Sequence, residues 1–147
     1  MDTIEKIHPS GLVTISLNDK IVQIVPNLIT TAGKEWIADR MQQDTGSAVM
    51  GWMTVGTSST AAAIGDTGCT TQIFHQALTT SGGVVAGAVI TFATTIAPGD
   101  GTGAIAEASI SHNVTVDTGD CLAHTVFAVI NKGALDTMTI SWAVTIS

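Results

Sequence analysis

The stretch Met138-Thr139-Ile140-Ser141-Trp142-Ala143-Val144-Thr145-Ile146-Ser147 alternates apolar and small polar residues almost without a break. Successive side chains of a β-strand point to opposite faces of a sheet. The even positions should therefore face a core, and the odd positions should face solvent or a neighbour. The stretch predicts a half-buried strand.

Further stretches predict strands, most of them alternating in the same way, and turn residues separate them. The stretches are 12–17, 20–25, 49–56, 70–79, 84–96, 104–111 and 122–130, and the clearest turns are Asn18-Asp19, 81–83, 98–101, 118–120 and 131–133. Gly, Asn and Asp adopt the backbone angles of tight turns at little steric cost, so each cluster separates two strands. Together with the final stretch they predict about eight strands.

One helix interrupts the strands. Thr30 or Thr31 can cap its N-terminus. The side chains that fall on one side at helical spacing, and should face the sheet, are Trp36, Ile37 and Met41, with the aliphatic stem of Arg40 beside them.

We therefore expect a mainly β protein: a two-sheet antiparallel β-sandwich, jelly-roll-like, with one short α-helix. An immunoglobulin-like sandwich is the alternative, but no Trp lies between Cys69 and Cys121, as that fold's Cys…Trp…Cys order requires. Residues 1–10 should form an extended N-terminal arm, because His8-Pro9 favours extended backbone. Residues 11–147 should form a single domain, with a long loop at 56–68.

The charge of the chain is low and negative. Charged residues make up 12% of the 147 residues, where a typical domain has about 25%, and the formal net charge is −7. The five basic residues are scattered, at Lys6, Lys20, Lys34, Arg40 and Lys132. They cannot neutralise a nucleic-acid backbone, so no nucleic acid and no anionic membrane is expected as a partner.

Targeting signals are not evident in the sequence. The mixed, polar N-terminus predicts no secretory signal, and no apolar run approaches the roughly 18–20 residues that span a bilayer. A protein that stays in, or is assembled from, a cytoplasm is expected. Cys69 and Cys121 could make one bridge, but no CxxC or metal-type spacing occurs, and buried free thiols are expected rather than a disulfide. The glycosylation pattern at Asn113-Val114-Thr115 is then accidental.

Residues able to do chemistry occur singly. The histidines are His8, His75, His112 and His124, without metal-ligand spacing between them or to either cysteine. His75 and His124 fall inside predicted strands, which favours a structural role. No GxSxG nucleophile motif occurs. We assign no catalytic, cofactor-binding or metal-binding residue, and expect no cofactor.

Glu107 is the exception, a carboxylate inside the apolar stretch 104–108. Strict alternation places Glu107 on the same side as Ile105, so an inward register would bury it. A buried carboxylate needs a partner, and Arg40 or Lys34 would supply a structural salt link. The outward register is also open.

Several segments, in order along the chain, resemble short virion structural proteins of tailed bacteriophages. They are 27–34, 53–58, 63–67, 105–108, 125–127, 130–132 and 136–142, which together span most of the domain. The resemblance implies a particle component without enzymatic activity. The small size, without a fibrous shaft, is most like a jelly-roll cement (decoration) protein on the outside of the capsid.

The resemblance further implies partners and a location. The partners would be the major capsid protein and a second copy of the chain, with a dimer favoured and a trimer possible, on a capsid assembled in the host cytoplasm. The arm and the 56–68 loop are the segments expected to reach a neighbour. A tail-fibre or baseplate adaptor of the same particle is the alternative.

A small hydrolase or a carbohydrate-binding domain is the alternative from another functional class, because fold does not dictate function. Carbohydrate sites usually expose aromatic side chains. The chain has three Trp, three Phe and no Tyr, and all of them occupy positions expected in the core. This alternative is therefore disfavoured.

Overall fold

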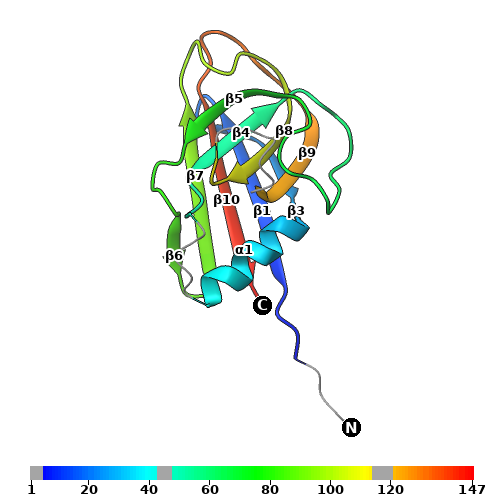
Figure 1. Ribbon diagram of the computed structural model, residues 1–147. Helices are drawn as coiled ribbons and strands as arrows, with labels where there is room; N and C mark the ends of the chain where they lie inside the picture. Colours follow the sequence, from blue (N-terminus) through cyan, green and yellow to red (C-terminus); the bar gives the residue numbers. More distant parts are fainter. Residues whose placement is uncertain (1–4, 43–47, 114–120) are drawn as a thin grey trace.

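Two five-stranded antiparallel sheets pack face to face in the computed structural model, which describes residues 5–42, 48–113 and 121–147 (Figure 1). Sheet A runs β2 (Lys20–Pro26), β1 (Pro9–Leu17), β10 (Met138–Ile146), β7 (Val89–Ile96) and β6 (Val84–Ala86). Sheet B runs β3 (Leu28–Ile29), β9 (Cys121–Lys132), β8 (Gly103–Ser111), β4 (Trp52–Gly56) and β5 (Gln72–Ala77). The expected two-sheet antiparallel sandwich with one short helix is confirmed.

Strand β10 lies at the centre of sheet A, between β1 and β7. It pairs with β1 from Pro9–Ile146 to Leu17–Met138. Its side chains at 138, 140, 142 and 144 are at most 2% exposed. The predicted alternation is thus confirmed for these four positions, which fill the core between the sheets, whereas Ile146 at the end of the strand is 37% exposed.

Two strand boundaries differ from the sequence prediction. The stretch 84–96 is not one strand but the hairpin β6–β7, because Gly87 adopts a positive φ of 60° and turns the chain. Strand β1 begins at Pro9, so residues 9 and 10 belong to the sheet rather than to the expected arm. By contrast, the tight turn at Asn18-Asp19 is as predicted, with φ of 51° and 64°.

Helix α1 (Thr31–Met41) lies at the end of the sandwich where the two chain ends emerge (Figure 1). Thr30 caps it by accepting a 2.9 Å hydrogen bond from the Gly33 amide. Gly33 packs directly on β9, since a Cβ there would lie 2.1 Å from the Leu122 carbonyl oxygen.

Only part of the helix face expected against the sheet is packed there. Trp36 and Ile37 pack on the core, as predicted. Met41 is 71% exposed, which contradicts the prediction. The physical reason is that the last helical turn borders an open hollow of about 260 Å³ between α1 and sheet A.

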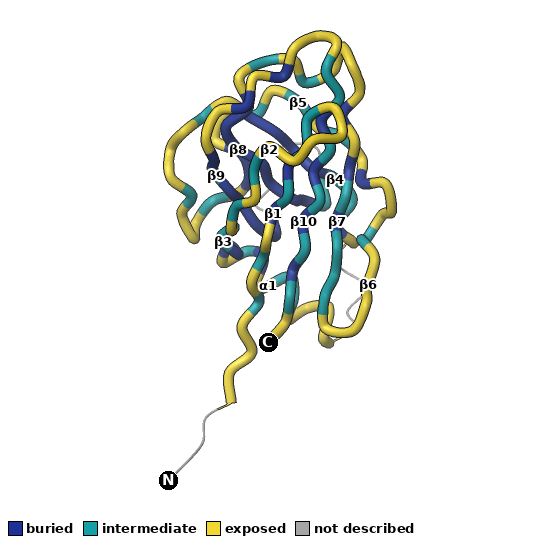
Figure 2. The backbone as a smooth tube through the Cα atoms, turned by 180° about the vertical axis from the view of Figure 1, so that it is seen from behind, coloured by how far each residue is buried: buried dark blue, intermediate teal, exposed yellow. Residues whose placement is uncertain are grey.

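The outer faces of the two sheets differ. The segment 57–71 folds back over the outer face of sheet B, and its backbone hydrogen-bonds to a β8 side chain there. Sheet A shows its outer face in Figure 2, with no described helix across it. The turn predicted at 118–120 and residues 114–115 of the glycosylation pattern lie outside the described residues.

Candidate functional site

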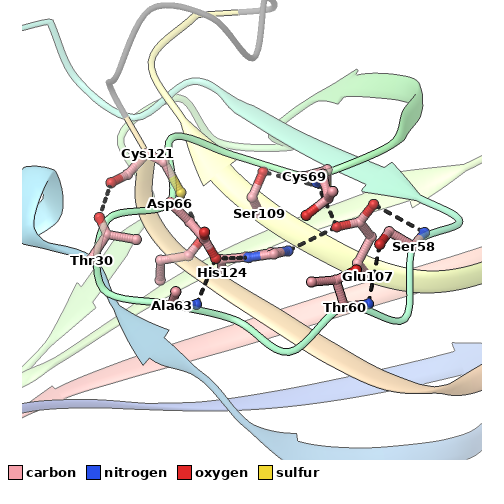
Figure 3. A network of polar contacts seen from close by, with 12 residues as sticks. Thr30, Ser58, Thr60, Ala63, Asp66, Cys69, Glu107, Ser109, Cys121 and His124 are labelled. Carbon is pink, nitrogen blue, oxygen red and sulfur yellow. Dashed lines mark hydrogen bonds and ion pairs between the residues drawn. The ribbon is translucent and has the colours of Figure 1, made fainter.

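A buried ion cluster lies between sheet B and the segment 57–71 (Figure 3). Glu107 comes from β8 and His124 from the adjacent strand β9, while Asp66 comes from the covering segment. Adjacent antiparallel strands bring the first two together, because Ser109 pairs directly with His124. The loop then adds the third member.

A break in the alternation of β8 turns Glu107 away from the core. Ile105 and Ala108 both belong to the hydrophobic core, although they are three positions apart and strict alternation would place them on opposite faces. The register with β9 shifts between Ile105 and Glu107, so these two side chains no longer share a face. The inference that Glu107 follows Ile105 inward is therefore wrong.

Glu107 is nevertheless 0% exposed, because the 57–71 segment covers it. Its Oε1 accepts hydrogen bonds from the amides of Thr71 at 2.7 Å and Ser58 at 3.2 Å, and its Oε2 accepts one from Thr70 at 2.7 Å. Gly56 leaves the space for this carboxylate, since a Cβ there would lie 2.4 Å from Oε1. The carboxylate thus fastens both ends of the segment to the sheet.

His124 bridges the two carboxylates. Its Nε2 lies 2.9 Å from Glu107 Oε2, and its Nδ1 lies 2.7 Å from Asp66 Oδ2. The expected partners Arg40 and Lys34 are not the residues that pair with Glu107; His124 and the loop amides take that place. Sequence reasoning missed this because neither cation of α1 reaches the outer face of sheet B, where Glu107 points.

The electrostatics favour a charged cluster. Burial disfavours the imidazolium, but the hydrogen bonds and charges of Glu107 and Asp66 outweigh it, so the pKa of His124 is raised above its ordinary value. Burial likewise raises the pKa of Glu107, but hydrogen bonds from His124 and the three amides outweigh that effect and lower it overall. These contacts therefore favour an imidazolium between the side chains of Glu107 and Asp66.

Cys69 lies beside this cluster with its thiol protonated. Its Sγ is 3.3 Å from Thr54 Oγ1 and 3.6 Å from Ser109 Oγ, and those two hydroxyls contact each other. Burial raises the pKa of the Cys69 thiol to about 12. Both ring nitrogens of His124 already face carboxylates, so the imidazole has no free nitrogen to activate the thiol. These contacts hold the covering segment on the sheet, and they do not pair the thiol with a base that could activate it.

The same residues include one group with the chemistry of a metal site. Ligand atoms of Cys69, Glu107 and His124 lie within 4.8 Å of one another, and Asp66 would orient the imidazole from its other side. A cation bound there would have to break the 2.9 Å contact between His124 and Glu107. It would also have to displace the proton of the Cys69 thiol, whose pKa is raised. The side chains as they lie satisfy one another without it.

Among the other residues singled out from the sequence, Cys121 lies beside Asp66 at the edge of the cluster (Figure 3), and the other histidines lie apart from it. Cys121 is a buried free thiol, as is Cys69, which agrees with the prediction for both. His75 is exposed on β5, with its ring against Trp52 at 5.4 Å, so the core position expected for Trp52 is only partly correct. His8 lies in the exposed arm, and its backbone pairs with Ser147. His112 is half-buried after β8.

Lys132 has a structural role that the sequence did not reveal. It is 2% exposed at the end of β9, and its ammonium donates hydrogen bonds to the carbonyl oxygens of Ala97 at 3.0 Å and Asp100 at 2.7 Å. The glycine-rich turn at 98–101, read as a turn from sequence, is thus held by a buried lysine.

Comparison with known proteins gives no relative for this chain: no family model, no curated protein and no solved structure matches it. In the described part of the chain, no helix has the length and apolarity needed to cross a membrane.

Proposed function

We propose that the chain is a non-enzymatic structural protein of a tailed-bacteriophage virion, a cement protein that binds the outside of the capsid and stabilises contacts between major capsid subunits. The proposal starts from the resemblance of the ordered segments between residues 27 and 142. The structure supports the proposal physically, because the segment 57–71 is held in place and exposes an apolar side chain.

The observation that carries the proposal is the fastening of the segment 57–71 by the buried cluster. Glu107 holds its two ends and His124 holds Asp66 in its middle. The carbonyl oxygen of Ile64 also accepts a 2.8 Å hydrogen bond from the Thr31 amide. A long irregular loop is thereby fixed in one conformation.

The fixed loop presents an apolar side chain to solvent. Ile64 is 61% exposed at a point where the backbone on both sides is anchored. Rigidifying a binding loop before contact lowers the entropy lost on binding, which raises affinity without adding contacts. A cement protein that binds several capsid subunits at once gains from each such contact, since linked binding sites can raise avidity by about 10²–10⁴.

The test is the copy number and the effect on the shell. A purified tailed phage that carries the protein should hold hundreds of copies in its heads, and heads stripped of the protein should lose resistance to heat and low salt. Re-adding wild-type protein should restore that resistance, and Ile64→Asp should restore less of it. Leu135→Asp is the matched control, because Leu135 is 89% exposed on a different loop.

Two results would overturn the proposal. A few copies confined to tails would support the tail-fibre or baseplate adaptor instead. Heads whose stability is unchanged after stripping would exclude a cementing role.

A further inference from the structure

Among the described strand residues, the outer face of sheet A carries no charged side chain. The strand pairing and burial place the following residues on it: Ile21, Ile24 and Pro26 of β2; Ser10, Leu12, Thr14 and Ser16 of β1; Thr139, Ser141, Ala143 and Thr145 of β10; Val89, Thr91, Ala93 and Thr95 of β7; and Val84 and Ala86 of β6. All belong to described strands. Aliphatic side chains border the face at β1–β2 and β6, and hydroxyl and methyl groups fill its centre.

This composition contrasts with the rest of the molecule. The chain has a formal net charge of −7, so two copies repel each other wherever acidic residues meet. On sheet B the charged groups Glu107 and His124 of the outer face are already covered by the protein's own segment 57–71. Sheet A offers a whole face on which two copies can approach without burying or opposing charges.

The face is also large enough. Strands β2, β1, β10, β7 and β6 have 7, 9, 9, 8 and 3 residues. At about 3.3 Å per residue and about 4.8 Å between strands, they make a surface of roughly 570 Å². Two such faces give about 1,100 Å² in all, which is above the roughly 1,000 Å² expected of a specific interface. Sheets pack face to face at about 10 Å with their strands nearly aligned, so a flat face of small side chains is suited to this contact.

We propose that the outer face of sheet A packs against the same face of a second copy, giving a two-fold symmetric dimer. Hydroxyl groups suit such self-contact because each of them both donates and accepts a hydrogen bond. A two-fold axis in the plane of the contact, along or across the strands, places the central strand β10 over its own copy. Ser141, in the middle of β10, then lies near the Ser141 of the second copy.

This symmetry makes a charge at position 141 a sensitive probe. In Ser141→Asp two carboxylates would face each other across the axis, and in Ser141→Lys two ammonium groups would. Each variant should raise the dimer dissociation constant about 100-fold or more, because opposed like charges cost several kcal/mol. An equimolar mixture of the two variants should form a heterodimer, because the charges are then opposite.

The experiment is sedimentation equilibrium on the full chain, with circular dichroism to show that each variant is folded. Wild type should have twice the 15.0 kDa chain mass. Ser141→Asp and Ser141→Lys alone should have the mass of one chain, and their mixture should return to two. Leu135→Asp, an equal charge change on an exposed loop, should leave the dimer intact.

The inference fails if wild type is a monomer, or if both variants remain dimers. Should a variant at 141 not fold, Thr91→Asp and Thr91→Lys on the neighbouring strand β7 make the same test. The dimer is proposed for the protein in solution, so binding to capsids is measured in a separate experiment. Monomeric wild type that loses capsid binding on Ser141→Asp would assign the face to the shell, which overturns the dimer and leaves the proposed function standing.

Discussion

Replacing His124 by Gln should destabilise the fold and change how its stability depends on pH. The substitution keeps a polar side chain of similar size but removes the imidazolium that lies 2.9 Å from Glu107 and 2.7 Å from Asp66. Removing one partner of a buried ion pair costs about 3–5 kcal/mol, because the other charge stays buried.

The local contacts place the expected value near the lower limit. Glu107 keeps its three backbone amide donors, which still compensate part of its charge. Asp66 is 24% exposed and can be rehydrated. We therefore expect a loss of about 3 kcal/mol in the free energy of unfolding, and faster hydrogen exchange at the Thr70 and Thr71 amides.

The pH dependence follows from the two shifted pKa values. The pKa of His124 is raised from 6.5, so its contribution is complete below pH 6.5 and is lost as the pH rises through the raised value. The pKa of Glu107 is lowered from 4.5, so its contribution is complete above pH 4.5 and is lost as the pH falls through the lowered value. The cluster therefore stabilises most between pH 4.5 and 6.5.

The test is urea unfolding of wild type and His124→Gln, which gives the free energy of unfolding of each protein within this pH range and above it. The difference between them should be largest between pH 4.5 and 6.5 and should shrink on the alkaline side. His75→Gln is the matched control, an exposed histidine on the same sheet, with an expected change within about 0.5 kcal/mol. A loss below about 1 kcal/mol, or one that does not vary with pH, would refute the charged cluster.

Three further outcomes are expected from the buried groups. Lys132→Met should lower the free energy of unfolding by about 2 kcal/mol in urea titrations, since two carbonyl oxygens lose a charged donor; an unchanged midpoint would contradict this role. Trp142→Ala should cost about 3–5 kcal/mol, and Trp52→Ala less because Trp52 is only half-buried; equal losses would count against this burial pattern. A thiol reagent should label Cys69 and Cys121 only after unfolding, because burial and raised pKa values keep both thiols inert; rapid labelling of folded protein would show otherwise.

Local pattern was sufficient to predict most of the fold. The alternation of 138–146 and the turn at Asn18-Asp19 both depend on neighbouring residues only, and both agree with the structure. The error at 84–96 has a local cause too: Gly87-Ala88 is a turn without the Asn or Asp that usually marks one. Met41 was misplaced because helical periodicity predicts the face of a residue but not where the core ends.

The candidate site was partly within reach of sequence reasoning. Consecutive strands predicted at 104–111 and 122–130 could have been paired as a hairpin, which would have brought Glu107 near His124. Two features of the site could not be predicted from the sequence. The register shift next to Ala106 reverses the side of Glu107, and no alternation pattern predicts such a shift. Asp66 and Cys69 arrive from an irregular segment whose path only the folded structure defines.

The central position of β10 in sheet A has a consequence for synthesis on the ribosome. The hairpins β1–β2 and β6–β7 emerge first, but each waits with an open edge, because β10 must enter between β1 and β7 to join them. Pairing across more than a hundred residues is slow, since a long chain segment must close before any contact is gained. Until then the exposed strand edges are sites where two nascent chains can pair with each other. Insertion of β10 closes both of these edges at once, because it pairs with β1 on one side and with β7 on the other.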